Sequence, residues 1–175
     1  MFKKLKDNLK KYLQFLVFSA LGIVIICSLF SYNSEDNAVY NFNSTLDSYN
    51  NFFGYPGSLI SDILLRAFGY SSYFIPIFFF LNGFRLLSNM ELKWYSWSSL
   101  PFLIIFTSFF LNFLDNKMSF FDIQGGFLGK ALFYYFETFF STTSYYYYLL
   151  VGLAIMLTLS LATTFNLGFM NVLKF

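Results

Sequence analysis

Two groups of residues in this 175-residue chain have types and spacings that could support chemistry. The first, Gly125-Gly126-Phe127-Leu128-Gly129-Lys130-Ala131, comes close to a phosphate-binding loop, whose backbone N–H groups hold phosphates. Such a loop needs GxxxxGK followed by Ser or Thr, whereas here the spacing is one residue short and Ala131 replaces the hydroxyl. We therefore expect these glycines to begin a helix and not to bind a nucleotide.

The second group is the pair Asp62 and Arg66, which lie four residues apart. We interpret it as an exposed ion pair on one helix face, worth a few tenths of a kcal/mol. Histidine is absent and Cys27 is the single cysteine, so the chain can form neither an internal disulfide nor a His/Cys metal site. The sequence predicts no catalytic, cofactor-binding or metal-binding residue and no enzymatic activity.

The composition indicates a membrane protein. Hydrophobic residues make up 57% of the chain and charged residues 11%, with a mean hydropathy of +0.57. Soluble domains carry about a quarter charged residues. Four segments reach the roughly 17–25 apolar residues that a transmembrane helix needs. We predict an all-α membrane protein with four transmembrane helices in two hairpins.

The predicted boundaries divide residues 1–175, taken as a single membrane domain, into ten segments. They are a basic cytoplasmic tail at 1–11, a first span at 12–32, an outside loop at 33–55, a surface helix at 56–69, a second span at 72–88, a cytoplasmic link at 89–96, a third span at 97–114, an outside loop with a second surface helix at 115–143, a fourth span at 145–163, and a cytoplasmic tail at 164–175 that leads toward a linker.

The orientation follows from the Lys and Arg residues, which are enriched on the cytoplasmic side of membrane proteins. Five lysines precede the first span, and Arg85 and Lys93 flank the link between the second and third spans. The loop 33–55 has no Lys or Arg but contains Glu35, Asp36 and Asp47. We therefore expect both termini in the cytoplasm and both long loops outside. Tyr145–Tyr148 are interpreted as interfacial anchors.

Each outside loop is predicted to end in an amphipathic helix on the outer, periplasmic face. From Gly57 to Phe68, apolar residues recur at helical spacing while Ser58, Ser61, Asp62 and Arg66 occupy the other side. Gly69 is a natural helix stop. After Gly126 a second apolar stripe recurs, with Lys130, Tyr134 and Glu137 opposite it. The pairs Gly57/Gly126 and Gly83/Gly152 are separated by the same interval, which indicates a weak internal repeat.

Several of these motifs are similar to the N-terminal four-span domain of the FtsK/SpoIIIE DNA translocases. The resemblance covers about residues 15–163. It departs from the family at Ser34 and Asn37, which stand where the family has prolines, and at Ser141–Ser144, where the family has glycines. The residues that carry it are Ser31–Asp36, Asn51–Asp62, Phe68-Gly69-Tyr70, Tyr73–Pro76, Gly83–Leu87 and Gly125–Gly129.

The resemblance implies a bacterial inner-membrane protein of the division septum, which anchors a hexameric ATPase that pumps DNA during chromosome segregation. It also implies contacts with the lipid bilayer and with division-site membrane proteins, and self-association and DNA binding only through a motor that is missing from these residues. The chain would then be an excised anchor domain or a stand-alone relative. Lateral contacts are expected at small residues such as Ala20, Gly22 and Gly152.

Two other functions stay open. A small membrane transporter or permease subunit is suggested by the weak repeat and by Pro76, which is expected to kink the second span. A membrane-bound enzyme acting on lipid or cell wall would use Asp62 or Glu137. Both lack the charge at a span midpoint or the carboxylate cluster that such chemistry generally uses.

Overall fold

The computed structural model describes residues 2–39, 49–88, 90, 92–118, 125–139 and 143–165. The middle of the first predicted outside loop and the segment 119–124 of the second lie outside the described residues. So do residues 140–142, which include the first half of the segment Ser141–Ser144, and the C-terminal tail from 166.

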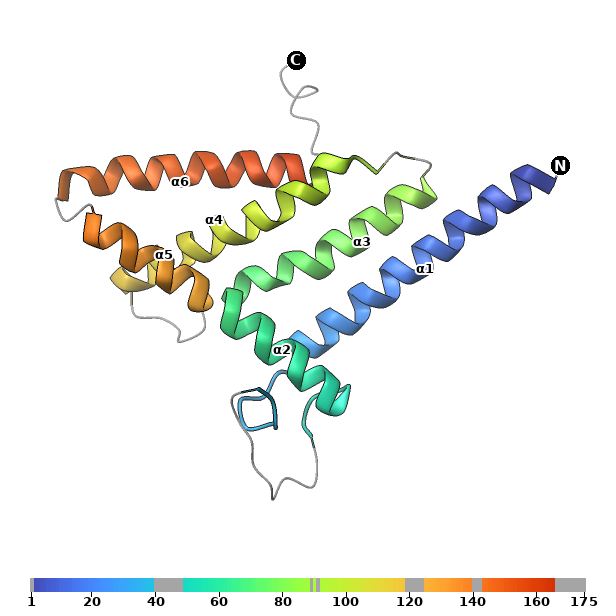
Figure 1. Cartoon of the computed structure of the whole chain (residues 1–175), viewed down its shortest axis with the longest axis horizontal. Helices are drawn as coiled ribbons and strands as arrows, with labels where there is room; N and C mark the ends of the chain where they lie inside the picture. The colour runs from blue at the N-terminus through green and yellow to red at the C-terminus, as the bar shows by residue number, and fades with distance from the viewer. Residues whose placement is uncertain are drawn as a thin grey trace, which may run out of the picture. The chain divides into compact units, whose positions relative to one another are not determined.

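All regular structure in these described ranges is helical, which confirms the all-α part of the predicted fold class (Figure 1). The helices are α1 (Phe2–Phe30), α2 (Gly54–Phe68), the short 3₁₀ helix η1 (Gly69–Tyr73), α3 (Phe74–Leu87), α4 (Trp94–Met118), α5 (Gly126–Phe139) and α6 (Thr143–Thr164).

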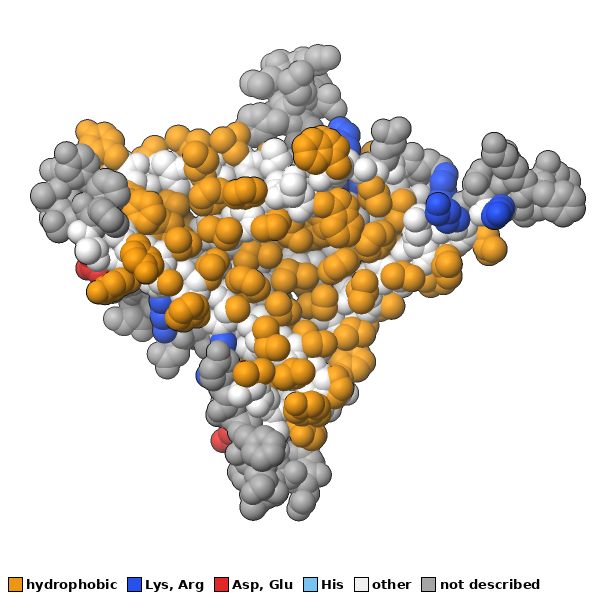
Figure 2. All heavy atoms as spheres, viewed as in Figure 1, with side chains coloured by type: hydrophobic (Ala, Val, Ile, Leu, Met, Phe, Trp, Pro, Cys, Tyr) orange, Lys and Arg blue, Asp and Glu red, His pale blue; other side chains and the backbone are white. Residues whose placement is uncertain are grey.

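Four helical stretches are long and apolar enough to cross a membrane, which is the predicted number, although the second begins at Gly54 and so includes the predicted surface helix 56–69. They are Asn8–Phe30, Gly54–Leu87, Trp94–Leu114 and Tyr147–Thr164. Hydrophobic side chains cover much of the visible surface of these helices, and Lys and Arg atoms appear near the N-terminal end of α1 and in smaller groups elsewhere (Figure 2). The arrangement as two hairpins and the outer position of α2 and α5 stay predictions.

The chain forms two compact units. The first comprises Met1–Ile63 and Tyr73–Lys93, and the second comprises Leu64–Ser72 and Trp94–Phe175. The chain therefore passes from the first unit to the second within α2 and returns at η1. At that point Gly69 has a φ of 63°, a conformation that favours glycine, and α2 ends at Phe68 as predicted.

In the first unit α1 packs lengthwise against α3 through glycines that face phenylalanine rings (Figure 1). A Cβ on Gly22 would lie 3.1 Å from the Phe80 ring, and one on Gly83 would lie 3.3 Å from Phe15. Small residues that admit a large neighbour are the usual means of close helix contact in membranes. Gly22 therefore packs against Phe80 within the chain, which corrects the expectation that it contacts other proteins. Ala20 and Gly152 are exposed.

In the second unit α4 packs against both α5 and α6. Phe109 lies against Phe136 of α5 with ring centroids 4.9 Å apart. At the other end of α4, the Ser96 hydroxyl donates to the Thr163 carbonyl at 3.3 Å and the Thr164 hydroxyl donates to Ser99 at 3.0 Å. These bonds connect the first turns of α4 to the last turn of α6.

Candidate functional site

The most developed site in the first unit is a buried polar network at the C-terminal end of α1. Ser28, Ser31, Asp36, Asn51 and Ser61 form it, and we call it the polar clamp. Asp36 and Asn51 are almost fully buried. A buried polar group is costly unless it is hydrogen-bonded, so each partner in the polar clamp matters.

Asp36 holds the segment that leads into α2. Its Oδ1 accepts from the backbone N–H of Asn50 at 3.0 Å, and its Oδ2 accepts from the backbone N–H of Asn51 at 2.9 Å. Both carboxylate oxygens are therefore engaged by backbone donors. This geometry assigns Asp36 a structural role in fixing the loop.

Asn51 connects the C-terminal end of α1 to α2 through its side chain. Its Nδ2 lies 2.9 Å from the Ser28 carbonyl, 3.3 Å from the Ser31 carbonyl and 3.4 Å from Ser61 Oγ of α2. A Cβ on Gly57 would overlap the Asn51 amide, and it would lie 2.8 Å from Phe53 Cβ. Only glycine leaves room there, so Gly57 and Asn51 depend on each other.

The polar side of α2 faces the protein, which corrects the amphipathic interpretation of this helix. Ser58, Ser61 and Asp62 are at most 2% exposed, whereas Ile63 on the predicted apolar side is 45% exposed. The Ser58 hydroxyl donates to the Asn37 carbonyl at 2.8 Å, and the Tyr32 hydroxyl donates to Asp62 Oδ1 at 3.3 Å. The interpretation of Asp62 and Arg66 as an exposed ion pair is therefore wrong, because Asp62 is buried.

A second polar site lies in the second unit, where the end of α2 and η1 meet α4. We call it the serine–glycine cluster. Ser108 of α4 donates to the Phe68 carbonyl at 3.0 Å, and its Oγ lies 2.6 Å from Ser71 Oγ. The residues of the serine–glycine cluster are Ser71, Ser108, Asn112, Gly125, Gly126 and Gly129.

The glycines of this cluster pack against protein atoms at the start of α5. A Cβ on Gly126 would lie 2.5 Å from the Gly69 backbone nitrogen, and one on Gly129 would lie 2.7 Å from the Ser108 carbonyl carbon. Gly126 also has a φ of 61°. The space that a phosphate would need is filled by α4 and by the turn at Gly69, so the glycines serve close contact between helices, as expected of residues that begin a helix.

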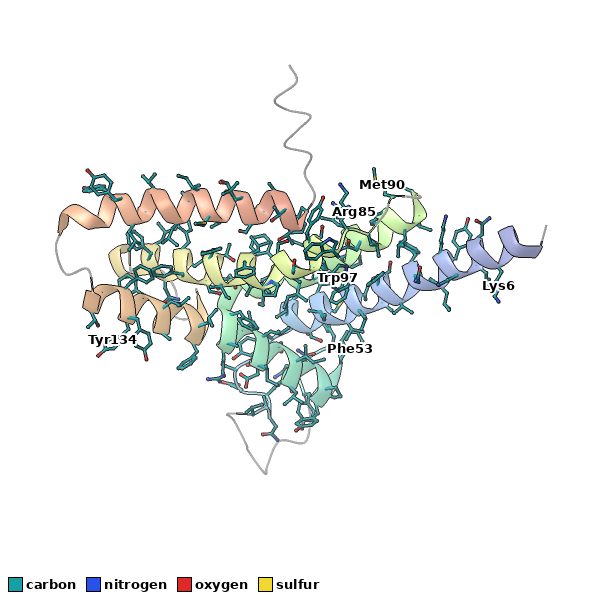
Figure 3. All side chains as sticks on the ribbon, turned by 45° about the horizontal axis from the view of Figure 1, so that its top comes forward. Lys6, Phe53, Arg85, Met90, Trp97 and Tyr134 are labelled. Atoms are coloured by element: carbon teal, nitrogen blue, oxygen red, sulfur yellow. The ribbon has the colours of Figure 1, made fainter. Side chains whose placement is uncertain are left out.

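The remaining candidate residues are dispersed. Pro76 lies in the first turn of α3, where a missing N–H is tolerated, and not at a kink within the span. Pro101 lies inside α4 and was not singled out from the sequence. Tyr147 and Tyr148 are exposed at the start of α6, and the Tyr145 and Tyr146 side chains lie outside the described residues. Glu137 is exposed on α5, as are Lys130 and Tyr134 (Figure 3).

No group of three potential metal-ligating side chains occurs within the described ranges. The two buried carboxylates, Asp36 and Asp62, both accept hydrogen bonds from protein donors. Their environment suits the fixing of loop and helix geometry. The polar clamp therefore acts chemically as a scaffold that holds an exposed segment in one conformation.

Asp36, Asn51 and Gly57 belong to the sequence motifs, but the motifs predict no contact for them, and Ser108 and Asn112 belong to no predicted motif or site. The available signal for the last two was their polarity within the otherwise apolar third span. Polar side chains inside a span usually bond within the protein, because lipid offers them no partner.

The model of the family described as the 4TM region of DNA translocase FtsK/SpoIIIE matches residues 7–173. No curated protein and no solved structure matches the chain.

Proposed function

This chain belongs to the FtsK/SpoIIIE 4TM family, and we propose that it anchors a translocase motor in the bacterial inner membrane and positions that motor at the division septum. The single observation that carries this proposal is the family match, which extends over nearly the whole chain. The four apolar helices support the membrane part of the proposal.

The proposed mechanism is binding and positioning, without catalysis by these residues. The polar clamp and the serine–glycine cluster hold loop segments against the helices, so that partners meet a defined surface. The proposed partners are the lipid bilayer and division-site membrane proteins. Hexamer formation and DNA contact belong to an attached motor. Both termini are proposed to be cytoplasmic, which would put the C-terminal end on the side of DNA and ATP.

The two features that suggested a transporter, Pro76 and the weak repeat, do not support that alternative in the structure. Pro76 begins a helix and does not interrupt one. The repeat does not extend to equivalent contacts, because Gly83 is packed against Phe15 and Phe18 whereas Gly152 faces open space. The alternative of an enzyme using Asp62 is not favoured either, because that carboxylate is buried and hydrogen-bonded to Tyr32.

A chimaera tests the proposed function. Residues 1–175 joined to the motor of a family member should restore chromosome segregation in cells whose own translocase lacks its membrane domain. The matched control joins the same motor to an unrelated four-span protein, which should anchor the motor without restoring segregation. Equal rescue by both chimaeras would show that anchoring alone suffices and would contradict a positioning role.

A further inference from the structure

Four consecutive backbone N–H groups just before α2 each donate to a side-chain oxygen. Those of Asn50 and Asn51 donate to Asp36, that of Phe52 donates to Ser31 Oγ at 3.0 Å, and that of Phe53 donates to Asn51 Oδ1 at 3.2 Å. The Gly54 N–H continues the series by donating to the Asn51 carbonyl at 2.8 Å. The segment 50–54 is therefore fixed along its whole backbone.

This fixed segment presents large apolar side chains on its outside. Phe52 is 76% exposed and Phe53 is 42% exposed, and Tyr55 at the start of α2 is also exposed. Phe53 is labelled in Figure 3. The segment is fixed by hydrogen bonds, and it exposes two adjacent phenylalanines to the outside. Exposed apolar surfaces of this kind mark sites of contact with lipid or protein.

The neighbouring spans show where this surface lies relative to a bilayer. Phe52 is bonded to Ser31, which directly follows Phe30, the last residue of the apolar stretch Asn8–Phe30. Phe30 is itself exposed, and its ring lies 5.7 Å from that of Tyr73, which immediately precedes α3. The Tyr73 hydroxyl donates to the Leu29 carbonyl at 3.3 Å. The end of α1 and the start of α3 therefore meet close to the point where Phe52 is bonded.

We propose that Phe52 and Phe53 form an aromatic anchor that inserts into the phospholipid leaflet at this end of the first unit. Phenylalanine side chains on the apolar face of interfacial segments bury at the boundary between the headgroups and the acyl chains. The end of the apolar stretch Asn8–Phe30 lies at that level. The polar side of α2 is already occupied by the polar clamp, so its exposed side continues the apolar surface of the anchor through Tyr55 and Ile63. The lipid leaflet is the occupant that fits this continuity.

The anchor does not depend on the septal role or on the direction in which the chain crosses the membrane. The aromatic anchor fixes the depth of α2 in the bilayer. The polar clamp holds the backbone of the anchor by hydrogen bonds, so that the two phenylalanine side chains stay exposed. Insertion can therefore be tested with purified protein in vesicles, without any division partner.

The test uses a single tryptophan as a depth probe. In protein carrying Trp94→Phe and Trp97→Phe, Phe52→Trp should be quenched by brominated phosphatidylcholine at least twofold more than Glu35→Trp, and its emission should be blue-shifted. Glu35 is a matched control because it is an exposed residue of the same unit. If the tryptophan replacements prevent folding, bimane attached at Phe52→Cys in Cys27→Ser protein, which keeps both tryptophans, gives the same readout.

Equal, weak quenching of the two probes, with equal access to aqueous acrylamide, would overturn the proposal. So would a Phe52 probe that is exposed to water in vesicles of the pure protein but shielded in native membranes, because that result would identify a protein as the occupant.

Discussion

The Asn51 side-chain amide lies 2.9 Å from the main-chain carbonyl oxygen of Ser28, so that a loop residue caps the last turn of α1. The final carbonyls of a helix have no partner within the helix, and here a side chain from beyond the loop supplies one. Through Ser61 the same amide reaches α2, so the end of the first span and the following helix are fixed together.

Asn51→Ala should destabilise the protein by about 2–3 kcal/mol, because it leaves the Ser28 carbonyl and the Phe53 N–H without their buried partner. Thermal unfolding in detergent, followed by circular dichroism, measures this effect. Glu35→Ala is the control, since the Glu35 side chain is exposed in the same unit, and it should change stability by about 0.5 kcal/mol or less. Similar losses for both variants would show that the polar clamp does not depend on the Asn51 side chain.

Three glycine-to-alanine variants should show that replacing a closely packed glycine lowers stability, whereas replacing a glycine with open space around it does not. Gly57→Ala and Gly126→Ala should each cost at least about 1–2 kcal/mol, the first by overlap with Asn51 and the second because of its positive φ and the nearby Gly69 nitrogen. Gly152→Ala has open space around it and should be neutral or slightly stabilising. Unfolding midpoints of the three proteins under one condition provide the comparison, and equal midpoints would contradict the close contacts.

Cysteine labelling should show that the polar side of α2 is buried. In Cys27→Ser protein, Lys130→Cys should react with an impermeant maleimide on intact spheroplasts, whereas Ser61→Cys should react only after denaturation. Rapid labelling of Ser61→Cys in the folded protein would restore the sequence-based interpretation of an exposed polar face. Labelling of Lys130→Cys only after membrane disruption would reverse the proposed orientation.

A second test of orientation uses reporters that are active only outside the cytoplasmic membrane. A fusion near Asn43, in the predicted outside loop, should be active, and one after Phe175 should be inactive, because lysines flank the cytoplasmic ends of the spans. The opposite pattern would contradict a cytoplasmic position for both termini.

The helices and their stops could be predicted because they depend on local signals. Long apolar runs predict spans, and Gly69 predicts the end of α2. The direction that α2 faces could not be predicted in this way. Its pattern has one polar and one apolar side, and the pattern alone assigns the polar side to water. That assignment fails because Asn37 and Tyr32, distant in sequence, supply partners for Ser58 and Asp62.

The close contacts of the glycines could not be predicted from the local sequence either. Gly125-Gly126-x-x-Gly129 was expected to begin a helix, and it does, but the need for each glycine comes from Ser108 and Gly69, which approach from other elements. Packing of this kind depends on which helices meet, and no spacing rule within one segment encodes it.

The central claim, that these residues carry the information for septal positioning, is tested most directly by imaging. A fluorescent fusion of residues 1–175, expressed at low level in a host with matching division proteins, is compared with a fusion of an unrelated four-span membrane protein. If residues 1–175 position the protein at the septum, this chain should form a midcell band, whereas the control should give uniform membrane fluorescence. Uniform fluorescence of the 1–175 fusion in dividing cells would contradict the claim.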